Sequence, residues 1–310
     1  MNQHKRTDQT ASQAVVFTTQ MMTVFIEHEK MIDKVLKRCH DLTATEFCIL
    51  RALYLAGGEA NGLDFAQFLM LKRNSISIAL SSLARKDLAS KAPSERDRRM
   101  LHVTETAAGR KITRDATASI YEAQKATFWS NLSLEDERGG NLVASLVLAK
   151  LRGVDYSATA PLKDENTPIS SEFVVFCKMV PQRWDFTLKG YSDLSLTDFR
   201  ILTCLDEWGS AARASDIARY LLLERSVVST RKDALITRGL VAESVDENDR
   251  RNSNLVVTGH GAALAARLKA HLSTETADMY SLCEEAGLSD EINDWHRVMY
   301  ANMSVMNYIL

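Results

Sequence analysis

The spacing of apolar residues along the chain predicts a series of amphipathic helices. In the first half, apolar positions recur every three to four residues over about 12–39, 65–69 and 74–86, and from the cap-like Thr45 to Gly57. This half of the chain is therefore expected to begin with a long helix and to continue with three shorter ones.

The period then changes from helical to alternating. Residues 88–91 and 101–104 predict two short strands around a polar loop at 93–99. Thr106 is expected to cap a further long helix, and a final helix is predicted over 134–151. A helix-turn-helix followed by a hairpin is the order of a winged helix-turn-helix. We therefore predict a mainly α fold with small β-wings and helical arms at both ends.

The whole pattern occurs twice. When 42–109 is placed over 194–261, an offset of 152, 22 of the 68 positions are identical without a gap. This share is roughly a third and far above chance, and the period is too long for a solenoid, whose units span about 20–50 residues. The sequence therefore predicts two copies of one domain.

The second copy is expected to use the same elements. Its first helix starts near Ser171 and is predicted to be interrupted at Pro181. Thr197 is its cap-like counterpart of Thr45, and Thr258 is its counterpart of Thr106. Its fourth helix, strands and last helix are predicted at 226–238, 240–243, 255–257 and 288–308. The predicted domains are 1–152 and 172–310, joined by a polar linker at 153–171.

Composition restricts the function classes. Gly and Pro, with 13 and 4 of 310 residues, are scarce, which agrees with a helical fold. Five scattered cysteines form no CxxC pair, and no metal-ligand spacing, P-loop or nucleophile elbow occurs. We therefore expect no metal, no cofactor and no enzyme activity. The longest apolar run is about ten residues, too short for a membrane span, so we expect a cytoplasmic protein with no membrane partner.

The outer face of the fourth predicted helix is small and polar in both copies, and both hairpin tips carry arginines. Such a helix face suits base edges in the major groove, and an arginine at a narrow tip suits the minor groove. Asp97 and Asp249 would hold the tip arginines in place. The alternatives are a solvated helix face and surface salt bridges. The expected DNA-binding residues are Arg73, Asn74, Ser75, Ser77, Arg85, Arg96, Arg98 and Arg99, and Arg225, Ser226, Ser229, Thr230, Arg231, Lys232, Arg250 and Arg251.

The run 42–109 resembles the MarR family of winged helix-turn-helix transcription regulators. The similarity lies in the sequence Asp97-Arg98-Arg99, followed by Thr106 and Gly109, and 194–261 repeats these residues at the same spacing. The resemblance implies homodimers with interlocking terminal helices, and one recognition helix and one wing on each half-site. It also implies small aromatic acids or phenols as effectors. Two copies in one chain would then form a single-chain pseudo-dimer.

The two copies differ in local charge, although the net charge of the chain is only −2. Residues 72–111 hold ten basic and four acidic residues, a net charge of +6, whereas 224–263 hold six of each. Phosphate neutralisation dominates DNA affinity, so the first copy should bind DNA more tightly and the operator should be asymmetric. We predict a sequence-specific, double-stranded DNA-binding transcription regulator. We expect it to be a repressor that a small aromatic ligand releases from DNA. The alternative is a winged-helix protein-interaction module that has lost DNA binding.

Two groups of residues have open interpretations. Cys39 and Cys177 lie at or in the predicted first helices and are interpreted as surface or core thiols, not redox sensors. Six aromatic residues could line an effector pocket or could simply be core, and the second is the commoner case. They are Phe25, Phe47, Trp129, Trp184, Phe199 and Trp208.

Overall fold

The computed structural model describes residues 14–61, 65–66, 69–93, 101–154, 171–245 and 253–309. The first half contains α1 (Thr19–His40), α2 (Ala44–Leu55), β1 (Glu59–Asn61), α4 (Arg73–Arg85), β2 (Ala89–Pro93), β3 (Leu101–Glu105), α5 (Ala107–Ala126) and α6 (Leu134–Arg152). The second half contains α7 (Ser171–Tyr191), α8 (Leu196–Trp208), β4 (Ala212–Arg213), α9 (Ala214–Tyr220), α10 (Arg225–Thr237), β5 (Val241–Val245), β6 (Ser253–Val257), α11 (Gly259–Met279), α12 (Ser281–Glu285) and α13 (Ser289–Ile309). The predicted mainly helical fold with small antiparallel sheets is confirmed. Most of the predicted linker, 155–170, lies outside the described residues.

Each half holds a three-stranded antiparallel sheet, where the sequence predicted two strands. The strand orders are β1-β3-β2 and β4-β6-β5, so the second hairpin strand is central in both. Ala60 pairs with Val103, and Ala212 pairs with Leu255, which is the same register shifted by 152 residues. The strands β1 and β4 escaped prediction because three and two residues are too few to show an alternating pattern.

The second helix of each half begins two residues earlier than predicted. The cap of α2 is Thr43, whose hydroxyl accepts from the Glu46 N–H while the Glu46 carboxylate accepts from the Thr43 N–H. Ser195 and Asp198 form the same capping box at α8. Thr45 and Thr197 were therefore the wrong caps. The reciprocal pair of hydrogen bonds decides the start, because it satisfies two backbone groups at once.

The predicted interruption at Pro181 is wrong, because α7 runs through this residue without a break. Pro181 removes one backbone hydrogen bond and would cost an isolated helix about 3 kcal/mol. Here α7 packs against α1, α2, α6 and α11, and its residues 172–177 are all buried. Burial on several sides holds the helical path despite the proline.

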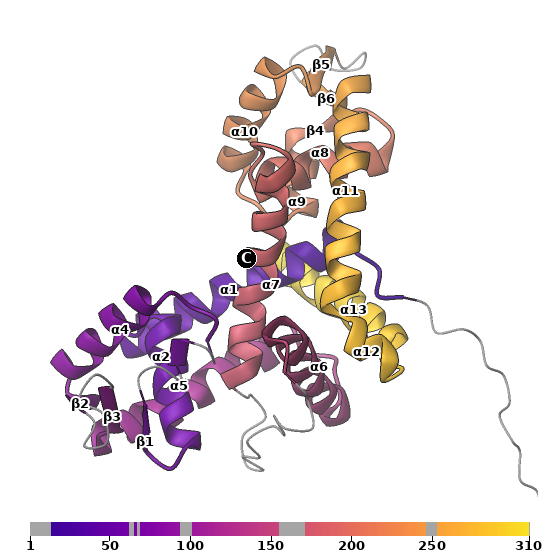
Figure 1. Ribbon diagram of the computed structural model, residues 1–310. Coiled ribbons are helices and arrows are strands. Elements are labelled where there is room, and N and C mark those ends of the chain that lie inside the picture. The colour runs from indigo at the N-terminus through magenta and orange to yellow at the C-terminus, as the bar shows by residue number, and fades with distance from the viewer. Residues whose placement is uncertain are drawn as a thin grey trace, which may run out of the picture.

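The terminal helices of each half pack against the first helix of the other half. The last helix of the first half, α6, packs against α7, and α13 packs against α1. The first helices α1 and α7 contact each other directly. Together these helices form a base from which two lobes extend, one at the left and one at the top of Figure 1. Within the described residues, no helix combines the length and apolar character needed to cross a membrane.

Trp295 closes the contact between α6 and α13. Its Nε1 donates a hydrogen bond to Oδ1 of Asp136, at 2.9 Å. Its ring lies over Gly139, where a Cβ atom would be 2.8 Å from Cζ2 of Trp295 and would overlap Cη2. Gly139 therefore provides the space in which the indole is seated, and the last helices of the two halves are held together.

Five of the six aromatic residues with open interpretations are core, including Phe25, which is 3% exposed. Trp129, Trp184, Phe47 and Phe199 are at most 2% exposed. The Trp184 indole N–H donates to the hydroxyl of Thr276 at 3.0 Å, so its only polar group is satisfied. These aromatic side chains belong to the continuous core that runs through both lobes and the base.

Candidate nucleic-acid interface

The helix α4 has one buried face and one polar face. Ile76, Leu80 and Leu83 are buried against the lobe. The opposite side chains are open to solvent, in agreement with the predicted binding face. They are Arg73, Asn74, Ser75, Ser77 and Arg85, to which the structure adds Ile78. No ion pair engages Arg73 or Arg85 among the described residues, so both guanidinium groups are available to an anionic ligand.

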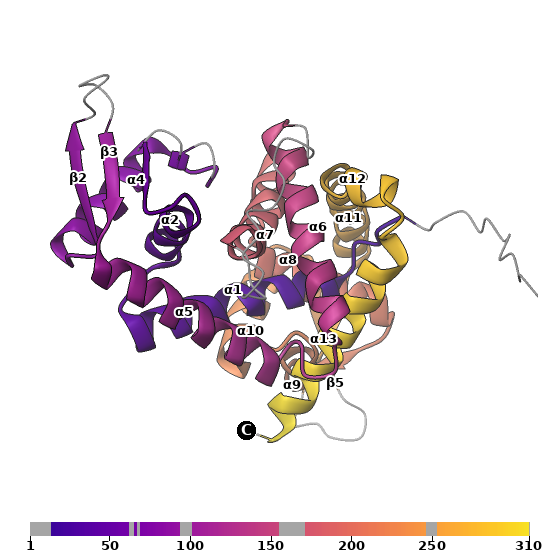
Figure 2. The same ribbon diagram turned by 90° about the horizontal axis from the view of Figure 1, so that it is seen from below.

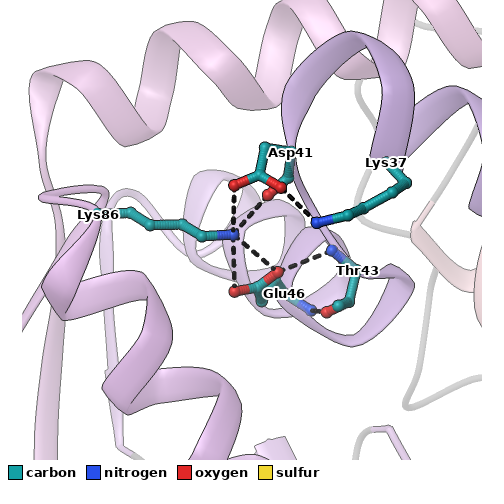
Figure 3. A network of polar contacts seen from close by, with 5 residues as sticks. All are labelled: Lys37, Asp41, Thr43, Glu46 and Lys86. Carbon is teal, nitrogen blue, oxygen red and sulfur yellow. Dashed lines mark hydrogen bonds and ion pairs between the residues drawn. The ribbon is translucent and has the colours of Figure 1, made fainter.

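A network of charged groups fastens the end of α4 to the corner between α1 and α2 (Figure 3). The Lys86 ammonium lies 3.2 Å from Oε1 of Glu46, 3.6 Å from Oδ2 of Asp41, and donates to the Asp41 backbone carbonyl. Lys37 also pairs with Asp41. Burial alone would raise the pKa of Glu46, but hydrogen bonds from Ser82, the Thr43 N–H and Lys86 outweigh it and lower the pKa. The network therefore holds the end of α4 in place against the corner between α1 and α2.

The second half has an equivalent tie. Arg238 pairs with Asp193, and these residues correspond to Lys86 and Asp41 at the offset of 152. One ion pair of this corner thus recurs in both halves, although the basic residue differs.

The outer face of α10 is also exposed, but two of its three cations are engaged by acids. Arg225, Ser226, Ser229, Thr230 and Arg231 are open to solvent, and Lys232 is half-buried. Arg231 lies 3.7 Å from the Asp198 carboxylate, and Lys232 lies 2.6 Å from Glu243. Neither contact has a counterpart on α4. The two halves therefore differ in the pairing of individual cations as well as in local net charge.

The base of each hairpin is anchored by a threonine that caps the next helix. Thr106 accepts from the Gly109 N–H at 2.9 Å and donates to the Asp87 carbonyl at 2.7 Å. Thr258 and Gly261 repeat the cap at 3.0 Å, and Thr258 donates to the Gly239 carbonyl at 2.7 Å.

The two glycines of these caps also lie against backbone. A Cβ on Gly109 would overlap the Leu88 carbonyl oxygen, and a Cβ on Gly261 would overlap that of Leu240. These close approaches account for both glycines of the sequence motif.

The hairpin tips, 94–100 and 246–252, lie outside the described residues. The predicted contacts that fall there are Arg96, Arg98, Arg99, Arg250 and Arg251, with their supports Asp97 and Asp249. They stay predictions.

The helices α4 and α10 lie in different lobes, α4 in the lobe at the left of Figure 1 and α10 in the lobe at the top (Figures 1 and 2). The hairpins β2–β3 and β5–β6 lie at opposite ends of the molecule, and α1 and α7 lie between them. Each lobe therefore carries one exposed helix and one hairpin, and the base lies between the two lobes.

A cavity of about 680 Å³ lies in the second half, where α9, the start of α10 and α13 meet. Trp208, Tyr220 and Tyr300 line it, with neighbouring ring centroids 5.1 and 5.7 Å apart in edge-on contact. Its charged lining residues are Asp216, Arg219, Glu224 and Arg225. Of the six aromatic residues with open interpretations, Trp208 lines this cavity, and Phe25 lines a smaller one of about 40 Å³ in the base.

The structure assigns no chemistry to the cysteines. Cys177 is buried, and burial raises the pKa of its thiol, which disfavours the reactive thiolate. Cys39 is exposed on α1. Among the described residues, no three His, Cys, Asp or Glu side chains are placed to bind a metal ion.

In a comparison with known protein families, residues 194–253 match the MarR family. No curated protein matches the chain. Similar solved structures include the transcriptional regulator BldR from Sulfolobus solfataricus, at 20% identity, with 36% of this chain and 77% of that chain covered and a TM-score of 0.33. CouR from Rhodococcus jostii RHA1 bound to p-coumaroyl-CoA shares 26% identity over 32% of this chain and 68% of that chain, with a TM-score of 0.30. CouR bound to a 23-mer DNA duplex shares 28% identity over 33% and 70%, with a TM-score of 0.31.

Proposed function

We propose that this protein is a sequence-specific, double-stranded DNA-binding transcription regulator that represses by occupying a promoter. The observation that carries the proposal is the exposed polar face of α4 beside a hairpin, where Arg73 and Arg85 form no ion pair with any residue that the structure describes. Small polar side chains and free arginines suit base edges and phosphates in a major groove. The family match at 194–253 supports the same role for the second half. We also propose that the protein is cytoplasmic.

The chain acts as a single-chain pseudo-dimer of two tandem domains, 1–152 and 172–310, with the linker at 153–171. The packing of α6 on α7 and of α13 on α1 supports this, because each half completes the base of the other. The seat of Trp295 over Gly139 adds a contact that joins the two last helices. We expect light scattering to give the mass of one chain. A stable two-chain assembly would contradict the pseudo-dimer.

The first half supplies most of the DNA affinity, and the operator is asymmetric. The charge count of +6 against 0 is the main support, and the pairing of Arg231 and Lys232 with acids adds to it. A cation already paired with a carboxylate gains less from a phosphate. The two recognition helices enter successive major grooves about 34 Å apart, and the hairpin arginines grip the flanking minor grooves.

The matched pair Arg73 and Arg225 tests this assignment, since both are exposed at the first position of their helices. Duplexes are first selected from a random library with the full chain, and affinity is then measured by fluorescence anisotropy at several salt concentrations. We expect Arg73→Ala to weaken binding more than Arg225→Ala, and each to reduce the salt slope by about one. No enrichment of DNA, or affinity indifferent to salt, would overturn the proposed function.

The cavity of the second half is the site for a small aromatic effector. Three aromatic rings and the cation Arg225 suit an aromatic carboxylate, whereas Arg219 is paired with Asp216. Arg225 belongs to α10 and Tyr300 to α13, so a ligand held between them shifts α10 relative to the base and away from the DNA-competent state. We expect benzoate to weaken DNA binding and cyclohexanecarboxylate to do so less. Equal effects of both would count against an aromatic site.

The second candidate function is a winged-helix protein-interaction module that has lost DNA binding. The observation that favours it is the engagement of the α10 cations by Asp198 and Glu243. The salt dependence of DNA binding separates the two functions.

A further inference from the structure

One apolar side chain stands in the middle of the polar face of α4. The residues that point away from the lobe are spaced by three or four positions, at Asn74, Ile78, Ser81 and Arg85, which form the outward stripe. Ile78 is 64% exposed, one of the six most exposed large hydrophobic residues among the described part of the chain. The buried face of α4 already has its own apolar residues, so packing within the lobe does not explain this isoleucine.

The surroundings of Ile78 are basic and polar. Arg73 and Arg85 lie towards the two ends of the outward stripe, and Lys91 on β2 donates to the Ser81 hydroxyl at 2.8 Å. A single isoleucine among such groups is too small an apolar area for a protein interface, whose core is depleted in charge. The local charge instead complements the phosphates on either side of a groove.

The second half offers a methyl group at the equivalent position. Thr230 corresponds to Ile78 at the offset of 152 and is also exposed. Its hydroxyl donates its proton to the Ser226 carbonyl at 3.0 Å, and its γ-methyl is the apolar group that it offers to a ligand. Both outward helices therefore carry an aliphatic group at the same place.

We propose that Ile78 reads a thymine through its 5-methyl group, and that Thr230 does so more weakly in the other half-site. Thymine is the only base that presents an apolar group in the major groove, where Ala, Thr and larger apolar side chains contact it. This thymine readout rests on the proposed DNA-binding function. It makes that function more definite, since it assigns one base to one side chain. The binding site of the first half then contains a preferred thymine opposite the centre of α4.

Uracil interference tests the assignment, because deoxyuridine pairs as thymidine does but lacks the methyl group. Duplexes selected with the full chain are prepared with sparse deoxyuridine and divided into bound and free fractions. With the unmodified protein, we expect one thymine of the first half-site to be depleted in the bound fraction about fourfold, the factor that one buried methyl group supplies. In Ile78→Ala this depletion disappears, because from the same backbone position the shorter side chain no longer reaches the thymine methyl group, and in Ile78→Val it persists.

Val305 and Leu134 are the controls, because they are 60% and 64% exposed on helices outside the lobes. Val305→Ala and Leu134→Ala should leave the interference pattern unchanged. If DNA is bound and the pattern of Ile78→Ala equals that of the unmodified protein, the methyl readout is wrong and the DNA-binding function stands. If no DNA is enriched from the library, both fail. Capture of a protein partner that depends on Ile78 would also overturn the readout.

Discussion

The contact between α6 and α13 tests how the two halves are joined. Gly139 and Gly140 are neighbours in α6, so alanine at either position gains the same helix propensity, about 1 kcal/mol. Their surroundings differ. A Cβ on Gly139 would lie 2.8 Å from Cζ2 of Trp295 and would overlap Cη2, whereas a Cβ on Gly140 would meet only Cε2 of Phe173, at 3.8 Å. The first is a clash and the second an ordinary contact.

The magnitude follows from these two environments. The Trp295 ring is held by its hydrogen bond to Asp136, so it cannot turn away from a new methyl group without losing that bond. Overpacking of this kind costs about 1–3 kcal/mol. We expect Gly140→Ala to raise the free energy of unfolding by about 1 kcal/mol, and Gly139→Ala to lie about 1–3 kcal/mol below Gly140→Ala. Helix propensity cancels in this difference.

The assay is urea unfolding followed by far-ultraviolet circular dichroism, with equal slopes required for the comparison. In a Trp295→Leu background, the difference between the two alanine variants should shrink, because leucine lacks the ring atoms that clash. Equal stabilisation by both substitutions would refute the packing of α13 on α6, and with it the support that this contact gives to the pseudo-dimer.

Three further predictions concern pH, the α4 network and the hairpin tips. Burial lowers the pKa of His28 from 6.5 to about 3. As the pH drops below 6.5, the unfolded chain therefore takes up a proton at this histidine before the folded chain does, and the free energy of unfolding falls by about 2 kcal/mol at pH 5. His28→Phe should reduce the slope of stability against pH, measured by urea titrations, and an unchanged slope would count against this prediction. Lys86→Met should lower the free energy of unfolding by about 1–3 kcal/mol at pH 7. The loss should become smaller once the pH falls below the lowered pKa of Glu46, because the protonated carboxyl group no longer forms the ion pair; a pH-independent loss would contradict the ion pair. Arg99→Ala should weaken DNA binding more than Arg251→Ala in gel shifts at one salt concentration, and equal losses would argue against the unequal halves.

Features that depend on neighbouring residues were predicted well. The helices α4 and α10 begin and end one residue from the predicted limits. Thr106 and Thr258 cap α5 and α11 as predicted, since an N-cap bond joins residues only three apart. The polar outer face of α4 was also predicted, because helical spacing alone separates it from Ile76 and Leu80.

One local feature, the N-cap of α2, was nevertheless predicted at the wrong residue. Thr45 and Thr43 are both plausible from composition, and the reciprocal bond with Glu46 separates them. The exposure of Ile78 was missed for a related reason. An isoleucine in a helix is usually assigned to the core, although its position in the outward stripe was readable from the same spacing.

Tertiary structure decided the contacts between segments that are distant in the chain. Gly139 and Trp295 stand far apart in sequence, and nothing in the local pattern of either helix shows that an indole needs the space beside a glycine. The engagement of Arg231 by Asp198, across two helices, is of the same kind. The sequence by itself determined the elements and the recurrence of their order, because hydrogen bonding and apolar spacing act over a few residues. Which helices pack together, and which charges remain free for a ligand, depended on the folded chain bringing remote side chains within a few ångströms.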